Sequence, residues 1–505
     1  MRIIGRASRV ATLSDSIFDG EPVPREIRPE NWLLEGAVHK ARVLTRGADS
    51  TRHLAGPQVP VLRDDNRRVS WAGYVENGAL VLHKIGKRHI DRQVIAENNV
   101  WRFHLALDKF LGRATAVWVT TEGAKRRLFL DGVPVETASD DVDFPFFEFS
   151  QVPVGHVATS EPAYGLLAYK CRSTGAIFAR RVVRGQIEPE RRLEVGPVVG
   201  GITFGIFEDR VIARVDRLEG QSLVPALLES SDGGRTFGAA RDLDLGDYRA
   251  SLPSEESDVR VAAGYTQPIV DKGGDFHIPI IASNAKESFA LNYVLRENAL
   301  VEAIRVAGKN PAGHLEVFPS TVGSKNSYGN GISDGHGLIM VLETEGKLYS
   351  SNSSAGGIHF PDARLLNHDM PLIRSFAPSA CYSSGLKDNV VSMDYLFFES
   401  DPQGRILSPE LYFETWDMPL PLPQGEATSR GSAVEVRLTA DADFEPGKVM
   451  FGFDDPTIEI TEVKIGGMRS ATVSTNADDL AGKTLTYDVL TLFHRHHGQI
   501  VITAG

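Results

Sequence analysis

The sequence predicts an all-β protein whose main body is a β-propeller and whose C-terminal part is a small β-sandwich. From about residue 68 onward, short runs rich in Val, Ile, Phe, Tyr and Thr are broken by Gly, Asp and Asn, and scarcely a segment keeps helical spacing for three turns. Many of these runs come in pairs around a polar tip, and one Ser/Gly/aromatic octet recurs along the chain. The predicted strand pairs and triplets are 70–85, 114–132, 164–183, 204–215, 276–306, 337–352 and 390–414.

Composition limits the possible partners. The 505 residues are 42% hydrophobic and 24% charged, with a formal net charge of -12 at pH 7. Because nucleic acid and anionic membranes attract a positive surface, neither is expected as a partner. Basic pairs such as Arg126-Arg127 and Arg180-Arg181 are scattered and are interpreted as solvated strand ends. No apolar run approaches the ~20 residues that cross a bilayer, so membrane insertion is not expected.

The chain divides by composition into four parts. Residues 1–64 are punctuated by proline and form an arm that either closes the propeller or docks on a partner, and residues 65–415 form the propeller. Residues 416–432, WDMPLPLPQGEATSRGS, are predicted to be a linker because of their Pro, Gly and Ser content. Residues 433–505 hold about six short alternating strands and form the β-sandwich.

The octet SSDGGRTF, which begins at Ser230, is predicted to fasten a hairpin. Asp232 can accept hydrogen bonds from turn amides, and the hydroxyls of Ser230 and Thr236 can add weaker bonds. Gly234 supplies a positive φ angle that a side chain would disfavour. Phe237 is expected to begin the next strand and to wedge its ring between neighbouring sheets.

The octet recurs along the chain. In SSAGGIHF, Ser353, Gly357 and Phe360 keep their offsets, and weaker matches begin at Cys171 and Ser400. The four starts are separated by 59, 123 and 47 residues. If the longest step spans two units, the mean step corresponds to the ~40 to 50 residues of a propeller blade, somewhat enlarged by loops.

The octet resembles the Asp box, Ser-x-Asp-x-Gly-x-Thr-Trp/Phe, of sialidases and related bacterial-neuraminidase-repeat proteins. TQPIVDKGGDFHIPII (266–281) is similar to a strand pair that opens blades in this superfamily, and ACYSSGLKDNVVSMDYLFFES (380–400) is similar to a late sialidase segment. The resemblance covers about residues 65–415 and implies six blades, while the 59-residue step leaves seven open. It also implies that the boxes lie on the rim away from the active site, so the octet residues are structural candidates.

The resemblance gives only two catalytic candidates. It implies a tyrosine nucleophile and three arginines that converge on the substrate carboxylate. Tyr382 matches the late tyrosine, and Arg374 is the nearby arginine. However, the early Arg-Ile-Pro motif is missing, and Lys347 replaces the arginine expected before the second octet. Since lysine lacks the planar fork of arginine, sialic-acid hydrolysis by the family mechanism is not expected.

A glycine-rich segment offers two binding candidates. GNGISDGHG (329–337) does not lead into a helix, so it is not a phosphate-binding loop. Asp334 and His336 are its exposed polar candidates for contact with a ligand.

No metal and no cofactor are predicted. His494 and His496 alternate in a predicted strand but lack an adjacent acidic or thiol ligand. The acidic run SDDVDFPFFEFS (139–150) lacks the regular alternation and the turn glycine of a calcium loop. The two cysteines, Cys171 and Cys381, are expected to be buried thiols.

The leading functional hypothesis is surface recognition of a glycan or a protein partner through a propeller face. The alternative is a polysaccharide-active enzyme, either a sialidase-like hydrolase or a lyase. No secretory signal is visible in the arginine-interrupted N-terminus. The expected location is a virion or the extracellular space after release, and otherwise the cytoplasm. Other virion proteins, such as those of a phage tail, or a second copy of the chain are the expected protein partners.

Overall fold

The computed structural model is almost entirely β, which confirms the all-β part of the prediction. In the described part of the chain, the single helix is the short α3 (Gly246–Ser251). The structure describes residues 23–26, 38–49, 60–64, 69–86, 90–108, 110–150, 161–220, 222–254, 256–262, 266–270, 274–309, 311–319, 336–353, 357, 360, 363–365, 372–382, 390–403, 405–419, 424–439, 449–465, 470–490 and 495–505.

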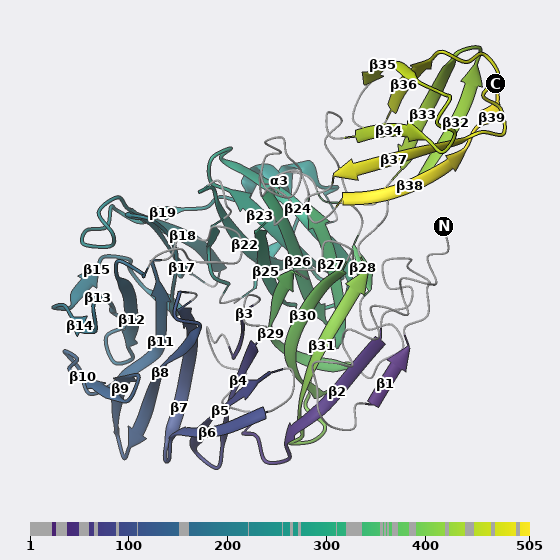
Figure 1. Cartoon of the computed structure of the whole chain (residues 1–505). Helices are drawn as coiled ribbons and strands as arrows, with labels where there is room; N and C mark the ends of the chain where they lie inside the picture. The colour runs from purple at the N-terminus through teal and green to yellow at the C-terminus, as the bar shows by residue number, and fades with distance from the viewer. Residues whose placement is uncertain are drawn as a thin grey trace.

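Within these residues, seven sheets of antiparallel strands follow one another between residues 38 and 419 (Figure 1). Sheet 1 holds β3 (Val61–Asp64), β4 (Val69–Glu76), β5 (Ala79–Ile85) and β6 (Ile90–Ala96); sheet 2 holds β7 (Val100–Asp108), β8 (Arg113–Glu122), β9 (Lys125–Leu130) and β10 (Val133–Val135); sheet 3 holds β11 (Val142–Phe149), β12 (Gly165–Cys171), β13 (Ile177–Val183), β14 (Gln186–Ile187) and β15 (Arg191–Leu193); sheet 4 holds β16 (Val198–Phe207), β17 (Arg210–Glu219), β18 (Ser222–Ser230) and β19 (Arg241–Asp242).

The remaining three sheets continue this pattern. Sheet 5 holds β20 (Arg260–Val261), β21 (Ile269–Val270), β22 (Phe276–Ser283), β23 (Glu287–Val294) and β24 (Ala299–Ala307); sheet 6 holds β25 (Ala312–Pro319), β26 (His336–Thr344), β27 (Lys347–Ser353) and β28 (Arg364–Leu365); sheet 7 holds β29 (Ile373–Tyr382), β30 (Val390–Glu399) and β31 (Leu411–Pro419), to which β2 (Val38–Thr45) and β1 (Val23–Glu26) are added.

The seven sheets form a closed ring. Their innermost strands contact one another in the cyclic order β3, β7, β11, β16, β21, β25 and β29, and β29 contacts β3 again. The inner strand β16 illustrates why the sequence folds this way, because nine of its ten residues are apolar or glycine and most are buried. A strand that is covered on both faces reads as such a continuous apolar run.

The N-terminal strand β2 helps to close the ring. It pairs antiparallel with β31, with Ala41 opposite Glu414 and Arg42 opposite Phe413, and the purple and green strands lie side by side in Figure 1. The prediction left open whether the arm, residues 1–64, closes the propeller or docks on a partner. In the structure it contributes β1 and β2 to sheet 7 and β3 to sheet 1. A buried ion pair between Arg63 Nη1 of β3 and Asp394 Oδ1 of β30, 2.8 Å apart, also joins the first sheet to the last.

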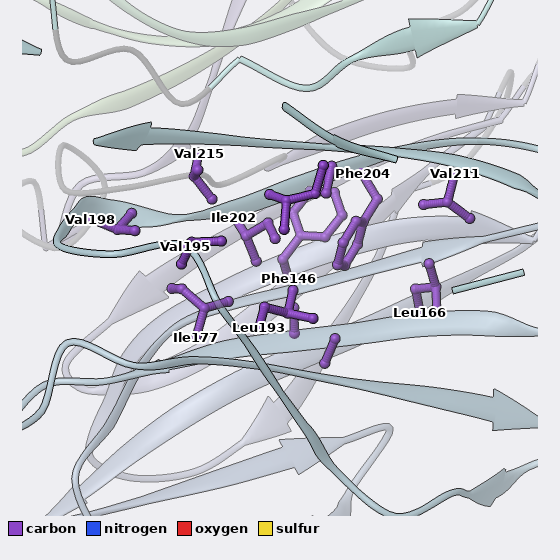
Figure 2. Close-up of a cluster of buried hydrophobic side chains, with 14 of the residues drawn as sticks. Phe146, Leu166, Ile177, Leu193, Val195, Val198, Ile202, Phe204, Val211 and Val215 are labelled. Atoms are coloured by element: carbon purple, nitrogen blue, oxygen red, sulfur yellow. The ribbon is translucent and has the colours of Figure 1, made fainter. Parts of the chain in front are cut away.

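Apolar side chains fill the space between neighbouring sheets. Figure 2 shows the cluster between sheets 3 and 4, with Phe146 and Phe204 at its centre. Their ring centroids lie 5.8 Å apart with the rings edge to face, an arrangement that aromatic quadrupoles favour. Each interface of this kind sets the position of one sheet against the next.

The SSDGGRTF octet forms the turn between β18 and β19, the third and fourth strands of sheet 4. Asp232 Oδ1 accepts a hydrogen bond from the Thr236 amide at 2.9 Å, and Asp232 Oδ2 accepts one from the Thr236 hydroxyl at 2.6 Å. The Ser230 hydroxyl donates to Asp232 and accepts from the Gly234 amide at 2.9 Å. Desolvation alone would raise the pKa of the Asp232 carboxyl, but these bonds outweigh it and hold that pKa well below its usual range.

The aromatic residue of the octet lies in the turn itself. Phe237 precedes β19 and so does not begin that strand, in contrast to the prediction. Its half-buried ring packs against the apolar cluster between sheets 3 and 4 and stacks on Phe204 at a centroid distance of 6.0 Å. The expected wedge therefore exists, supplied by a loop residue.

The second octet occupies the corresponding place in sheet 6, between β27 and β28. The Gly357 amide donates to the Ser353 hydroxyl at 3.1 Å, which repeats the bond between Gly234 and Ser230. Both glycines have left-handed backbones, with φ of +73° and +77°. Phe360 is half-buried and packs against an apolar cluster of sheets 5 and 6.

The two weaker matches are not equivalent to these turns. CRSTGAIF forms the hairpin between β12 and β13, and SDPQGRIL connects β30 with β31. Both therefore join second and third strands, whereas the octets join third and fourth strands. Their spacings therefore do not measure the repeat. Gly175 of the first match has a φ of +71°, as tight hairpins generally require.

The C-terminal residues form two further sheets, drawn in yellow in Figure 1. One has the order β35-β36-β33-β32-β39 and the other β34-β37-β38, and a single apolar cluster that includes Val436, Val473 and Tyr487 draws on both. The strand bounds are β32 (Gln424–Arg430), β33 (Ala433–Thr439), β34 (Val449–Phe453), β35 (Ile460–Ile465), β36 (Ser470–Thr475), β37 (Thr484–Leu490), β38 (Arg495–Val501) and β39 (Thr503–Ala504).

The predicted linker 416–432 differs from the structure. It contains the end of β31 and the whole of β32, which pairs with β33 along its length. Gly425, which suggested a linker, lies under Ile500, and a β-carbon there would come within 2.2 Å of the Ile500 side chain. The glycine allows close packing inside a sheet, a role that composition does not distinguish from flexibility.

We predict that Gly234→Ala destabilises the protein more than Gly185→Ala. Both glycines have nearly the same φ, +77° and +79°, but a β-carbon on Gly234 would lie 2.8 Å from Leu166 Cδ2, while Gly185 has nothing within 4 Å. Leu166 is fully buried, so the clash adds an overpacking cost of about 1–3 kcal/mol to the shared backbone cost. Urea unfolding of the two variants measures the difference. Equal losses would show that the octet turn is not packed against sheet 3.

Candidate functional site

The antiparallel strand order gives the ring two distinct ends. In a sheet of consecutive antiparallel strands, the turns between strands one and two and between strands three and four lie at one end, and the start of strand one lies at the other. The octet turns at Gly234 and Gly357 are third-to-fourth turns and mark the first end, here called the octet end. The starts of the inner strands β7, β11 and β16 lie at the opposite end.

At this opposite end, a buried carboxylate holds two arginines from different strands. Asp143 at the start of β11 is 3.0 Å from Arg102 Nε of β7 through Oδ1, and it accepts a hydrogen bond from Arg126 Nη1 of β9 through Oδ2. All three side chains are at least nine-tenths buried. Since removing charges from water is costly, such a group is stable only when each charge is paired.

Two half-exposed aromatic rings lie against these cations. The Arg102 guanidinium carbon is 4.0 Å from the centroid of the Phe144 ring, and Lys170 Nζ of β12 is 5.7 Å from the same centroid. The Arg126 guanidinium carbon is 4.7 Å from the centroid of the Trp101 ring. We call this group, Trp101, Arg102, Arg126, Asp143, Phe144 and Lys170, the cation–aromatic cluster.

Phe144 has an unusual backbone. Its φ of +51° is in the left-handed region, which bulky residues rarely adopt. A β-bulge between Asp143 and Phe146 shifts the register of β11 there, and a β-carbon on Gly201 of β16 would lie 2.7 Å from Phe144 Cβ. Strained backbones of this kind persist where surrounding structure holds them, and they concentrate at functional sites.

The electrostatics of the cluster favour an anion. Three cations face one carboxylate, so the formal charge of the group is positive. Burial lowers the pKa of Lys170, whose ammonium group donates to the Val198 carbonyl at 2.6 Å. Beneath the cluster, His104 packs on Phe146 with ring centroids 4.4 Å apart, and burial lowers its pKa to about 3, so it is neutral at physiological pH.

The sequence candidates Arg374 and Tyr382 do not lie together. Both are in β29, where Arg374 pairs with Phe398 near the start and Tyr382 pairs with Val391 at the end. Eight residues of extended strand separate them by roughly 25 Å, so the two cannot contact one substrate carboxylate. Tyr382 also lies at the octet end, which the resemblance assigns to the rim away from an active site.

The other sequence candidates gain no support from position. Asp334 lies outside the described residues, and His336 is described only as the first backbone position of β26, which is again at the octet end. The pair His494 and His496 falls where side chains are not described.

The acidic run is occupied by ion pairs. Asp140 pairs with Lys125 at 2.6 Å, Asp141 lies 3.6 Å from Arg172, and Asp143 belongs to the cation–aromatic cluster. Across the described ranges, no group of three or more His, Cys, Asp or Glu side chains is arranged to hold a metal ion.

The cluster was missed because its members are far apart in sequence and were given other roles. Arg126 was interpreted as a solvated strand end, but only 8% of its surface is exposed. The same interpretation was wrong for Arg181 of a second basic pair, which is 6% exposed. The signal was the alternation of strand residues, since Arg127, the neighbour of Arg126, has 58% of its side chain exposed.

Comparisons with known proteins give remote likenesses. No family model and no curated protein matches the chain. Among solved structures, the polysaccharide lyase Uly1 has a TM-score of 0.41 at 9% identity, covering 72% of this chain and 90% of its own. The Dos1 propeller has a TM-score of 0.36 at 8% identity, and the match covers 70% of this chain and 77% of that one. A neuraminidase-like protein of A/flat-faced bat/Peru has a TM-score of 0.34 at 8% identity, and the match covers 75% of this chain and 93% of that one. TM-scores below 0.5 assign neither a fold nor an activity.

A search for membrane-crossing helices gives a negative result for the described residues. None of their helical segments has the length and apolar character that a bilayer span requires.

We predict that Asp143→Ala strongly destabilises the protein and that Asp140→Ala does not. Loss of the Asp143 carboxylate leaves two buried guanidinium groups without their counter-charge, which costs about 3–5 kcal/mol. Asp140 pairs with Lys125 on the surface, where solvent screens the pair. Thermal unfolding of both variants at neutral pH tests the difference, and an Asp143→Ala variant as stable as the wild type would refute the buried ion pair.

Proposed function

We propose that the ring is a seven-bladed β-propeller, that the two C-terminal sheets form a separate β-sandwich, and that the protein recognises a glycan through the cation–aromatic cluster. The cyclic contacts of the seven innermost strands support the propeller, and they favour seven blades over the six that the octet resemblance implied. The apolar cluster common to the two C-terminal sheets supports the sandwich.

The half-buried Phe144 ring, which has Arg102 and Lys170 close to it, is the observation that carries the glycan proposal. An aromatic face offers an apolar platform for the C–H surface of a sugar ring, while neighbouring cations can pair with an acidic substituent. The contact with the Arg102 guanidinium orders the Phe144 ring before a ligand arrives, which lowers the entropic cost of binding.

The ion pairs of Asp143 favour recognition over catalysis. Both of its oxygens are engaged by guanidinium groups, so it is a poor general base for a hydrolase or lyase. A polysaccharide-active enzyme is therefore the second candidate, and it would need an acid or base from outside the cluster. Surface recognition also fits a virion component such as a phage tail or receptor-binding protein, a proposal that rests on the sequence alone.

The wild type should bind glycans on an array. Phe144→Leu and Lys170→Met should each weaken this binding roughly tenfold, because the first removes the aromatic ring and the second removes a cation beside it. Phe129→Leu is the matched control, since Phe129 is half-buried in the neighbouring sheet 2 and stacks on Trp118. Acidic glycans should bind better than neutral ones.

A parallel assay for release of reducing or unsaturated ends separates binding from turnover. Release of product by the wild type would favour the enzyme. Absence of glycan binding, or an equal loss in Phe129→Leu, would contradict the proposed site.

A further inference from the structure

The five-stranded C-terminal sheet ends at β35, which has a neighbour on one side. Within the described residues β35 pairs with β36 and with no strand beyond it. Among the described strands, its outer edge therefore presents backbone N–H and C=O groups without a ladder partner, and such an edge is a template for another strand.

The side chains of β35 are exposed and include an apolar one. Thr461, Glu462, Val463 and Lys464 all lie at the surface, and Val463 is 40% exposed. Lys464 Nζ lies 3.0 Å from Glu462 Oε2, so these two charged side chains share one face of the strand. Val463 lies between them on the other face, as strand alternation requires.

This pattern is complementary to itself in one arrangement. If two copies of β35 pair antiparallel about Val463, Glu462 of each copy lies directly opposite Lys464 of the other. Directly opposite residues of an antiparallel pair have side chains on the same face and within contact distance. A parallel pair, or an antiparallel pair shifted by two residues, instead places Glu462 against Glu462 or Lys464 against Lys464, which is repulsive.

We propose that the β35 edge joins two copies of this chain, antiparallel and with a two-fold axis through Val463. The two five-stranded sheets then continue as one sheet across the interface, and the contact is isologous. Two cross-strand ion pairs replace the internal Glu462–Lys464 pair, which is exposed at both ends and contributes little by itself. Like-charge repulsion in the other registers makes the contact selective.

The predicted dimer is weak. Six residues of strand bury far less than the ~1,200 Å² of a specific, stable interface. Association should therefore be reversible, appear at tens of micromolar or higher, and weaken as salt screens the ion pairs.

Sedimentation velocity of the full chain over a concentration series tests the proposal by charge reversal. Lys464→Glu gives two facing pairs of acids, and Glu462→Lys gives two facing pairs of bases, so each variant alone should dimerise at least about tenfold more weakly than the wild type. An equimolar mixture of the two variants should dimerise again, because the charges are then complementary. The double variant Glu462→Lys/Lys464→Glu should dimerise alone.

Met450→Lys is the matched control. Met450 is 48% exposed on β34, the edge strand of the neighbouring three-stranded sheet, so this change adds a charge to a different edge and should leave dimerisation unchanged. Because all the altered side chains are exposed, the variants should keep the wild-type melting temperature. The proposal is overturned by a wild type that stays monomeric at hundreds of micromolar. It is also overturned by a mixture no better than its components, or by association that Met450→Lys abolishes and Lys464→Glu does not.

Discussion

Closure of the ring is the constraint on which the rest of the structure depends. The first and last sheets are far apart in the sequence, so their contact must be built from non-covalent interactions alone. Backbone pairing of β2 with β31 and the buried pair between Arg63 and Asp394 supply it, together with an apolar cluster that joins Tyr74 of sheet 1 to Phe398 and Phe413 of sheet 7. Without this contact, one face of sheet 1 and one face of sheet 7 would be exposed to water.

The cation–aromatic cluster is a consequence of the same packing. Arg102 belongs to sheet 2 and Asp143 to sheet 3, so their ion pair forms only when the two sheets dock with their inner strands aligned. Gly201 of sheet 4 then leaves room for Phe144, which the bulge in β11 turns toward Arg102 and Lys170. Three successive sheets are thus needed to position one half-exposed ring.

The sequence was sufficient for the features that local chemistry determines. Runs of apolar residues around polar tips predicted the hairpins, and the Ser230 octet predicted a turn whose bonds to Asp232 and Gly234 are present. Contacts between side chains of different sheets could not be predicted, because nothing in the sequence near Arg126 or Asp143 indicates that these two residues form an ion pair. The linker prediction was wrong for a related reason, since it is the distant Ile500 side chain that leaves no room for a β-carbon at Gly425. Tyr382 and Arg374 were linked by analogy, and the length of β29 separates them.

Hydrogen–deuterium exchange of an Arg42→Pro variant tests ring closure most directly. Proline at this position removes a donor from β2 opposite Phe413, and Gln93→Pro in β6 makes the same change in an outer strand that closes nothing. If β2 holds the ring closed, Arg42→Pro will speed exchange in β29 and β3 as well as in β31, while Gln93→Pro will affect only β5 and β6. Exchange that changes only in β2 and its direct neighbour β31 would contradict the account.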